Sequence, residues 1–349
     1  MAGFRFIATG IGSVPFTDIE GTCTDIIKEL PNAPYWPQFV KRTHLEDMSI
    51  QYSEGLPLLE IIEDKRSLRI YASKDKEAEL VKFYNHFLAG DTDYFSISST
   101  YAPGLYNLLE RFKNGEIPPG NYVKGQTVGP VTFAAGIIDI NDKVVLHNSE
   151  LFEALVSGLA IKALWQVKQL EKTGAKTIIF LDEPYLSGFG SAFSAIQKDE
   201  VIKALRTVID YIKADSNTLV GIHCCGNTDW AMLLESGPDI INFDAFGYMD
   251  HFFLYPEQIV SFIEKGGAVA WGIVPTAGFT GDETLDSLYA LLSEGLDRLR
   301  ELGIDPDLIA ERSILTPACG MGTMEPETAE KVLALLSGLS KRCREEYRD

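Results

Sequence analysis

The strongest constraint on the fold is the alternation of short apolar runs with longer amphipathic stretches. Several runs are nearly continuous in Val, Ile, Leu and Phe, as strands buried on both faces must be. The eight runs are 4–12, 55–62, 121–129, 177–184, 218–225, 240–248, 268–276 and 313–320. Stretches with helical spacing lie between them, most clearly at 148–175. This strand-then-helix order predicts parallel strands joined by helical crossovers.

Eight such runs favour an α/β fold with a single (β/α)8 TIM barrel, and a doubly wound open sheet is the alternative. A length of 349 residues suits one barrel with insertions, so we expect one domain over 1–349. Residues 13–54 and 63–120 are longer than minimal connections. We expect both segments to be insertions at the barrel mouth.

The charge and the cysteine count exclude several classes of protein. A net charge of −19 repels phosphate backbones and anionic lipid, so we expect neither a nucleic-acid partner nor a membrane-surface partner. No apolar run is long enough to cross a bilayer, and the opening "MAGFRFIATGIGSVP" is typical of a first strand, not of a secretion signal. Five unevenly spaced cysteines argue against a disulfide framework. We expect a cytoplasmic protein.

Reactive side chains stand at the ends of four of the predicted strands. They are Asp182 and Glu183, then His223 with Cys225, then Asp244, and finally Cys319. The carboxyl ends of parallel barrel strands all face one mouth, where barrel enzymes carry their active sites. We therefore expect these side chains to gather around one rim.

A His/Cys/Cys set within this group predicts a metal site. Side chains alternate along a strand, so His223 and Cys225 point the same way and Cys224 the other way. Together with Cys319 they form a ligand set that favours Zn²⁺. Three protein ligands leave a fourth position open, which is typical of catalytic zinc, and Asp244 could fill it weakly. The alternative is that the cysteines are small core residues, which is how we interpret Cys224.

Two further segments could bind a substrate. The backbone amides of "ATGIGSVP", around Gly12 and Ser13, could hold a carboxylate or a phosphate, or the segment could be only a tight turn. Asp182 and Glu183 in "FLDEP" could bind an amino group by charge, or could form an N-cap for the loop that follows them.

Six short motifs, in this order, carry a resemblance to a known family: "TGIGSVP", "VKGQTVGPVT", "FLDEPYL", "IHCCGNTDW", "DIINFDAF" and "TPACGMGT". From about residue 8 to the C-terminus the chain resembles the C-terminal catalytic barrel of cobalamin-independent methionine synthase. That barrel belongs to the wider uroporphyrinogen-decarboxylase-like superfamily of zinc methyltransferases.

The resemblance implies roles for individual residues. It implies that His223, Cys225 and Cys319 bind zinc, with Asp244 at the fourth-ligand position. The substrate contacts that it implies are Asp182, within the Asp182–Glu183 pair, for an α-amino group, Gly12 and Ser13 for a carboxylate, and Glu60 as a second amino-binding acid.

The activity that the resemblance implies is methyl transfer to a zinc-bound thiol in methionine biosynthesis. Homocysteine is the favoured acceptor, and another small thiol such as coenzyme M is possible. The family uses a histidine after its seventh strand on the folate donor, but "WGIVPTAG" has none. The segment "HCCGNT" is similar to corrinoid-dependent methyltransferases. We therefore expect methylcobalamin, or a methylated corrinoid protein as partner, to supply the methyl group.

Three other functions compete with this one. A uroporphyrinogen-type decarboxylase needs arginines to hold several carboxylates, and the motif segments are nearly empty of arginine. A zinc hydrolase favours histidine-rich sites, because thiolates reduce the Lewis acidity of the metal. The third is an accessory protein that binds a corrinoid or a metal without turnover.

Overall fold

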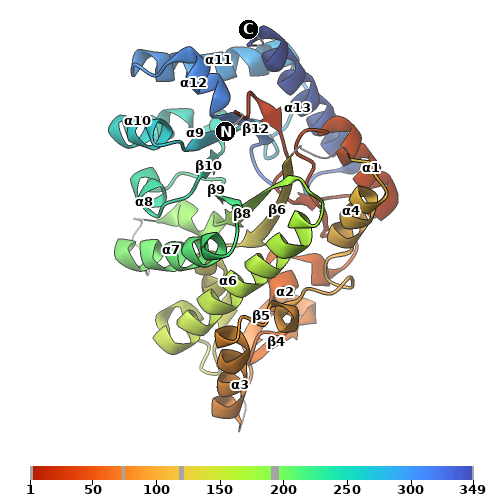
Figure 1. Cartoon of the computed structure of the whole chain (residues 1–349), viewed down its shortest axis with the longest axis vertical. Helices are drawn as coiled ribbons and strands as arrows, with labels where there is room; N and C mark the ends of the chain where they lie inside the picture. The colour runs from red at the N-terminus through yellow and green to blue at the C-terminus, as the bar shows by residue number, and fades with distance from the viewer. Residues whose placement is uncertain (1–2, 73–74, 118–121, 190–195, 348–349) are drawn as a thin grey trace.

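The main element of the computed structural model is a curled parallel sheet, and the described residues are 3–72, 75–117, 122–189 and 196–347 (Figure 1). Its seven strands follow the order β1, β12, β11, β10, β9, β8, β6. They are β1 (Ile7–Ala8), β6 (Tyr122–Val128), β8 (Lys176–Asp182), β9 (Leu219–Cys224), β10 (Ile240–Phe243), β11 (Ala268–Val274) and β12 (Ser313–Pro317). All neighbouring pairs in this sheet are parallel, which confirms the α/β class.

Thirteen α-helices accompany the strands in the described part of the chain. Figure 1 shows the later helices around the outside of the sheet: α6 (Ser149–Glu171), α7 (Lys198–Ala214), α8 (Trp230–Glu235), α9 (Ala245–Phe252), α10 (Pro256–Glu264), α11 (Leu285–Glu301), α12 (Pro306–Glu311) and α13 (Pro326–Glu346). The earlier helices are α1 (Ile19–Glu29), α2 (Met48–Ser53), α3 (Lys76–Leu88), α4 (Pro103–Lys113) and α5 (Pro130–Ala135). Among these described helices, none combines the length and apolar character that a membrane span requires.

The two segments expected to be insertions carry most of the early elements. Residues 13–54 contain α1 and α2, and residues 63–120 contain α3 and α4. Within the second segment, residues 73–74 and 118–120 lie outside the described residues, as does residue 121 of the strand expected at 121–129. Figure 1 shows α1 and α4 beside the sheet, and α3 with β4 and β5 at the end of the molecule away from the C-terminus.

The prediction of a barrel strand at 55–62 is wrong. This run forms β4 (Leu59–Ile62), which pairs antiparallel with β5 (Ser67–Ile70) in a separate three-stranded sheet with β7 (Ile137–Ile138). The residues between β4 and β5 form a tight turn that ends at Arg66 in a left-handed conformation. A hairpin of this kind brings β4 back on β5, and the residues of β4 are only partly buried.

The main sheet is not a closed barrel, so the eight-stranded expectation is confirmed only in part. Residues 32–39 lie across the opening between β1 and β6. The backbone N–H of Lys124 donates to Pro34 O at 2.9 Å, and that of Gln38 donates to Gly12 O at 3.0 Å. Here two short strands, β2 (Ser13–Val14) and β3 (Gln38–Phe39), pair in parallel.

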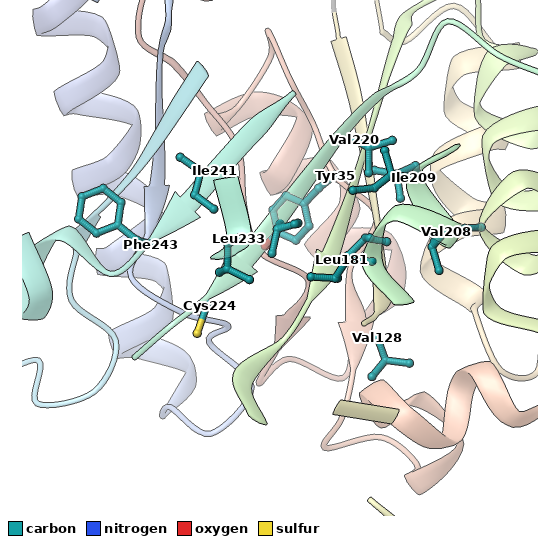
Figure 2. Packing of buried hydrophobic residues seen from close by; sticks show 14 of the residues in the cluster. Tyr35, Val128, Leu181, Val208, Ile209, Val220, Cys224, Leu233, Ile241 and Phe243 are labelled. Atoms are coloured by element: carbon teal, nitrogen blue, oxygen red, sulfur yellow. The ribbon is translucent and has the colours of Figure 1, made fainter. Parts of the chain in front are cut away.

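Side chains of the main sheet alternate between two environments. Those facing the helices join the large core shown in Figure 2, among them Leu181, Val220, Cys224, Ile241 and Phe243. Those facing the inside form a smaller apolar cluster together with Phe4 and Ala33, which lie outside the strands. Its strand residues are Ile7, Ile178, Phe180, Ile240, Ala268, Ala270 and Ile314. Two residues further along β8, β9 and β10, the interior face becomes polar, with Asp182, His223 and Asn242 at adjacent register positions. The sheet therefore has an apolar interior floor and a polar rim at its carboxyl end.

Candidate metal centre

The structure brings the three predicted thiol and imidazole ligands together. His223 lies near the end of β9, Cys225 follows β9, and Cys319 follows β12. The ligand atoms of the three residues all lie within 4.8 Å of one another. Such a group could hold a metal ion.

The His223 ring is buried, and its two nitrogens have different surroundings. Nδ1 lies 2.5 Å from Asn242 Oδ1. Nε2 is buried and has no hydrogen-bond partner among the described residues. A buried polar atom without a partner is costly unless a ligand satisfies it, so this nitrogen fits a metal ligand.

The Cys225 and Cys319 thiol groups are hydrogen-bonded to each other. A hydrogen bond from Cys319 lowers the pKa of Cys225 to about 4, against the opposing effect of burial and with help from His223. The same bond to Cys225 raises the pKa of Cys319, and burial adds to the rise. The group thus combines one imidazole with two thiol groups, one of them with a lowered pKa, and zinc prefers such a donor set.

Cys224 lies on the opposite face from this group, as predicted. Its side chain is fully buried in the outer core near Leu233 and Phe243 (Figure 2). Burial raises the pKa of its thiol to about 12. Cys224 is therefore a packing residue.

Asp182 sits beside His223 and has a free acceptor atom. The two residues are register partners on β8 and β9. Only 4% of Asp182 is exposed, and its Oδ1 is buried without a hydrogen-bond partner in the described part of the chain. Burial raises the pKa of Asp182 to about 6, although His223 and Lys124 act in the opposite direction. This carboxyl group could accept a hydrogen bond from a cationic amine at the rim.

The Glu183 carboxylate is hydrogen-bonded to the first turn of α5. Its carboxylate accepts hydrogen bonds from Val131 N at 2.9 Å, Thr132 N at 2.7 Å and Thr132 Oγ1 at 2.6 Å. Burial raises the pKa of Glu183 to about 7, although these hydrogen bonds lower it. The cap expected for the following loop is therefore not what these bonds form, because Glu183 instead accepts from the first turn of α5, which precedes it in the chain.

Asp244 is close to the cluster but also caps a helix. It is the N-cap of α9, and its Oδ1 accepts from Gly247 N at 2.8 Å. Burial raises its pKa, the bond from Gly247 opposes this, and the charge of Cys225 raises it further. Asp244 is not among the residues whose ligand atoms lie within 4.8 Å of one another.

Gly12 and Ser13 lie next to the loop that carries Cys319. Ser13 O accepts from Met321 N at 2.9 Å, and Ser13 Oγ accepts from Gly322 N at 3.3 Å. A Cβ at Gly12 would come within 2.6 Å of Gln38 Oε1, so the backbone here approaches its neighbour closely. This segment therefore lies beside the metal-ligand loop.

Glu60 lies in a different sheet from the other predicted site residues. It belongs to β4, and its carboxylate pairs with Arg69 at 3.5 Å. Its side chain is 46% exposed. The structure thus gives Glu60 a partner on the neighbouring strand β5.

The sequence analysis missed two buried polar residues of the interior, Lys124 and Asn242. Lys124 Nζ donates to Ile11 O and, at 3.2 Å, to Gln126 Oε1. Burial lowers the pKa of Lys124 to about 7, and Asp182 acts against this. The available signal was strand alternation, because Lys124 precedes Gln126 by two positions and Asn242 precedes Asp244 by two positions on the inward-facing side.

No family model matches the sequence, and no curated protein matches it. A solved structure that is similar is "The structure of a B12-independent methionine synthase from Shewanella sp. W3-18-1 in complex with Selenomethionine". The match has a TM-score of 0.58 and 15% identity, and covers 98% of each chain. The chain has a methionine-synthase-like fold. At this identity the likeness concerns the fold alone.

A second similar structure is that of 3-keto-D-glucoside 4-epimerase, YcjR, from E. coli, in its apo form. It has a TM-score of 0.33 and 13% identity, and covers 68% of this chain and 85% of the other. That TM-score is too low to carry an argument.

Proposed function

We propose that this protein is a zinc-dependent methyltransferase that transfers a methyl group to a small thiol, with homocysteine as the favoured acceptor. The observation that carries the proposal is the cluster of His223, Cys225 and Cys319 at the carboxyl end of the sheet, with ligand atoms within 4.8 Å of one another. The methionine-synthase-like fold supports the assignment to methyl transfer.

The donor set fits zinc. It offers one imidazole nitrogen without a partner, one thiolate and one thiol, and three protein ligands leave a position for a substrate. When bound, zinc supplies a Lewis acid that lowers the pKa of a coordinated thiol, so that the sulfur is nucleophilic at neutral pH.

The residues around the cluster suit an amino-acid thiol. The free Oδ1 of Asp182 would accept a hydrogen bond from the α-ammonium group. Gly12 and Ser13, beside the Cys319 loop, would offer backbone N–H groups to the α-carboxylate.

The corrinoid donor expected from the sequence gains no support from the comparison. The similar structure is described as B12-independent, and the match covers 98% of each chain. The proposal thus concerns the zinc site and the thiol, and the assay compares both kinds of donor.

The experiment incubates zinc-loaded protein with homocysteine and either methylcobalamin or a methylated folate, and measures methionine by mass spectrometry. We expect methionine with one of the donors, and loss of activity after chelation or in Cys319→Ser. Cys224→Ala is the matched control and should keep the activity, because Cys224 is buried in the outer core.

Two results would overturn the proposal. Zinc-loaded protein that turns over neither donor would be a metal-binding accessory protein. Activity that persists in the chelated protein would indicate a metal-free reaction.

A further inference from the structure

We infer that Asn242 is a positioning residue that keeps the proton of His223 on Nδ1 and thereby presents the Nε2 lone pair to the metal. The inference rests on the proposed zinc site and deepens it. It concerns a residue on β10 that belongs to neither ligand motif.

The orientation of the Asn242 side-chain amide is fixed by two neighbours. Its Nδ2 lies 2.8 Å from the backbone carbonyl of Ala270 and 2.8 Å from Thr316 Oγ1. A carbonyl oxygen only accepts, so the amide nitrogen must face Ala270. A flipped amide would place two acceptor oxygens against each other. The Oδ1 of Asn242 therefore faces His223.

This orientation decides which ring nitrogen of His223 carries the proton. Asn242 Oδ1 lies 2.5 Å from Nδ1, and an amide oxygen can only accept, so Nδ1 is the donor. A neutral imidazole carries one N–H, which leaves Nε2 as a bare lone pair. Nε2 is also the buried nitrogen without a hydrogen-bond partner in the described structure.

The anchoring of Asn242 makes this support rigid. Its side chain connects His223 on β9, Ala270 on β11 and Thr316 on β12, so four adjacent strands hold one imidazole in place. A partner on the second ring nitrogen sets both the tautomer and the ring orientation of a histidine ligand. Because asparagine is neutral, it does this without adding negative charge beside two cysteine ligands.

The test begins with the metal-free protein, so it does not depend on turnover. Long-range proton–nitrogen correlation spectra of ¹⁵N-histidine-labelled protein report which ring nitrogen is protonated. The chain has five histidines, and His223→Gln assigns the signal. We expect the wild type to carry its proton on Nδ1, and Asn242→Ala to move His223 towards the Nε2–H form.

Zinc affinity, measured by competition with a chromophoric chelator, gives a second readout. Asn242→Ala should raise the dissociation constant for zinc by about 10- to 100-fold. Asn242→Asp keeps an acceptor for Nδ1 but turns its second oxygen toward the Ala270 carbonyl, so it should keep the Nδ1–H form and lower the stability of the fold. Thr316→Val is the matched control, because Ala270 still holds the amide, and it should leave the tautomer unchanged.

A wild-type His223 without a proton on Nδ1 would overturn the inference, as would an Asn242→Ala variant with unchanged tautomer and unchanged zinc affinity. If Asn242→Ala does not fold, a Thr316→Val protein without a proton on His223 Nδ1 would equally overturn it. Wild-type protein that binds no zinc would contradict the proposed function instead, and the tautomer measurement would still decide the role of Asn242.

Discussion

The sulfur atoms of Cys225 and Cys319 lie within 4.8 Å of each other, although the two residues follow strands that are not neighbours. β10 and β11 lie between β9 and β12 in the sheet. In a flat sheet with strands ~4.8 Å apart, three spacings would separate the two strands by about 14 Å. The curl of the sheet therefore creates the candidate metal centre, since it brings the carboxyl ends of separated strands onto one rim.

Asp182→Asn should weaken binding of the acceptor amino acid and leave zinc binding intact. The substitution removes the charge beside His223 and keeps the shape of the side chain. A hydrogen bond to a charged group contributes about 1.5–3 kcal/mol, so KM for homocysteine should rise about 10- to 100-fold. Steady-state kinetics with a zinc assay on the same sample measure both effects. An unchanged KM would remove Asp182 from the substrate site.

Glu183→Ala should destabilise the fold, because it leaves the N–H groups of Val131 and Thr132 without their acceptor. The free energy of unfolding should fall by about 2–4 kcal/mol, as measured by urea denaturation. Glu183→Gln keeps one acceptor oxygen and should lose less. An alanine variant as stable as the wild type would show that Glu183 does not support α5.

Asp244→Ala should lower stability while the protein still binds zinc. Loss of the N-cap of α9 costs about 1 kcal/mol, and Asp244→Asn should avoid most of this cost. We expect one zinc per chain in both variants, because His223, Cys225 and Cys319 remain. Metal-free Asp244→Ala protein would show instead that this carboxylate is an essential fourth ligand.

Lys162 should make stability rise with pH. Its ammonium group is buried in α6 and donates to Phe95 O at 3.2 Å. Burial lowers its pKa from 10.5 to about 7, with Glu54 acting in the opposite direction. Between these two values the unfolded chain binds a proton that the folded chain does not. The free energy of unfolding should therefore rise with pH, by up to about 1.4 kcal/mol per pH unit from this group.

Lys162→Met tests this directly, because it removes the titrating group and keeps most of the side-chain volume. Urea denaturation at pH values from 7 to 10 should give a flatter pH dependence for the variant than for the wild type. Equal slopes for the two proteins would mean that Lys162 has an ordinary pKa.

Much of the architecture followed from the sequence because parallel strands leave strong local signals. The runs ending at Asp182, His223 and Cys319 are buried on both faces, and their carboxyl ends meet wherever the strands share a sheet. The prediction of a barrel strand at 55–62 was wrong because a short apolar segment has the same pattern in a barrel strand and in a hairpin. Asn242 and Lys124 were missed because their roles depend on partners from other strands, such as Ala270 for Asn242 and Ile11 for Lys124.

X-ray absorption spectroscopy at the zinc edge, on protein purified without chelator, tests the central claim most directly. The account predicts one zinc per chain with two sulfur neighbours at about 2.3 Å and a nitrogen neighbour at about 2.0–2.1 Å. Cys319→Ser should lose the metal or one sulfur neighbour, and Cys224→Ala should match the wild type. A zinc shell made only of nitrogen and oxygen, or protein without zinc, would contradict the account.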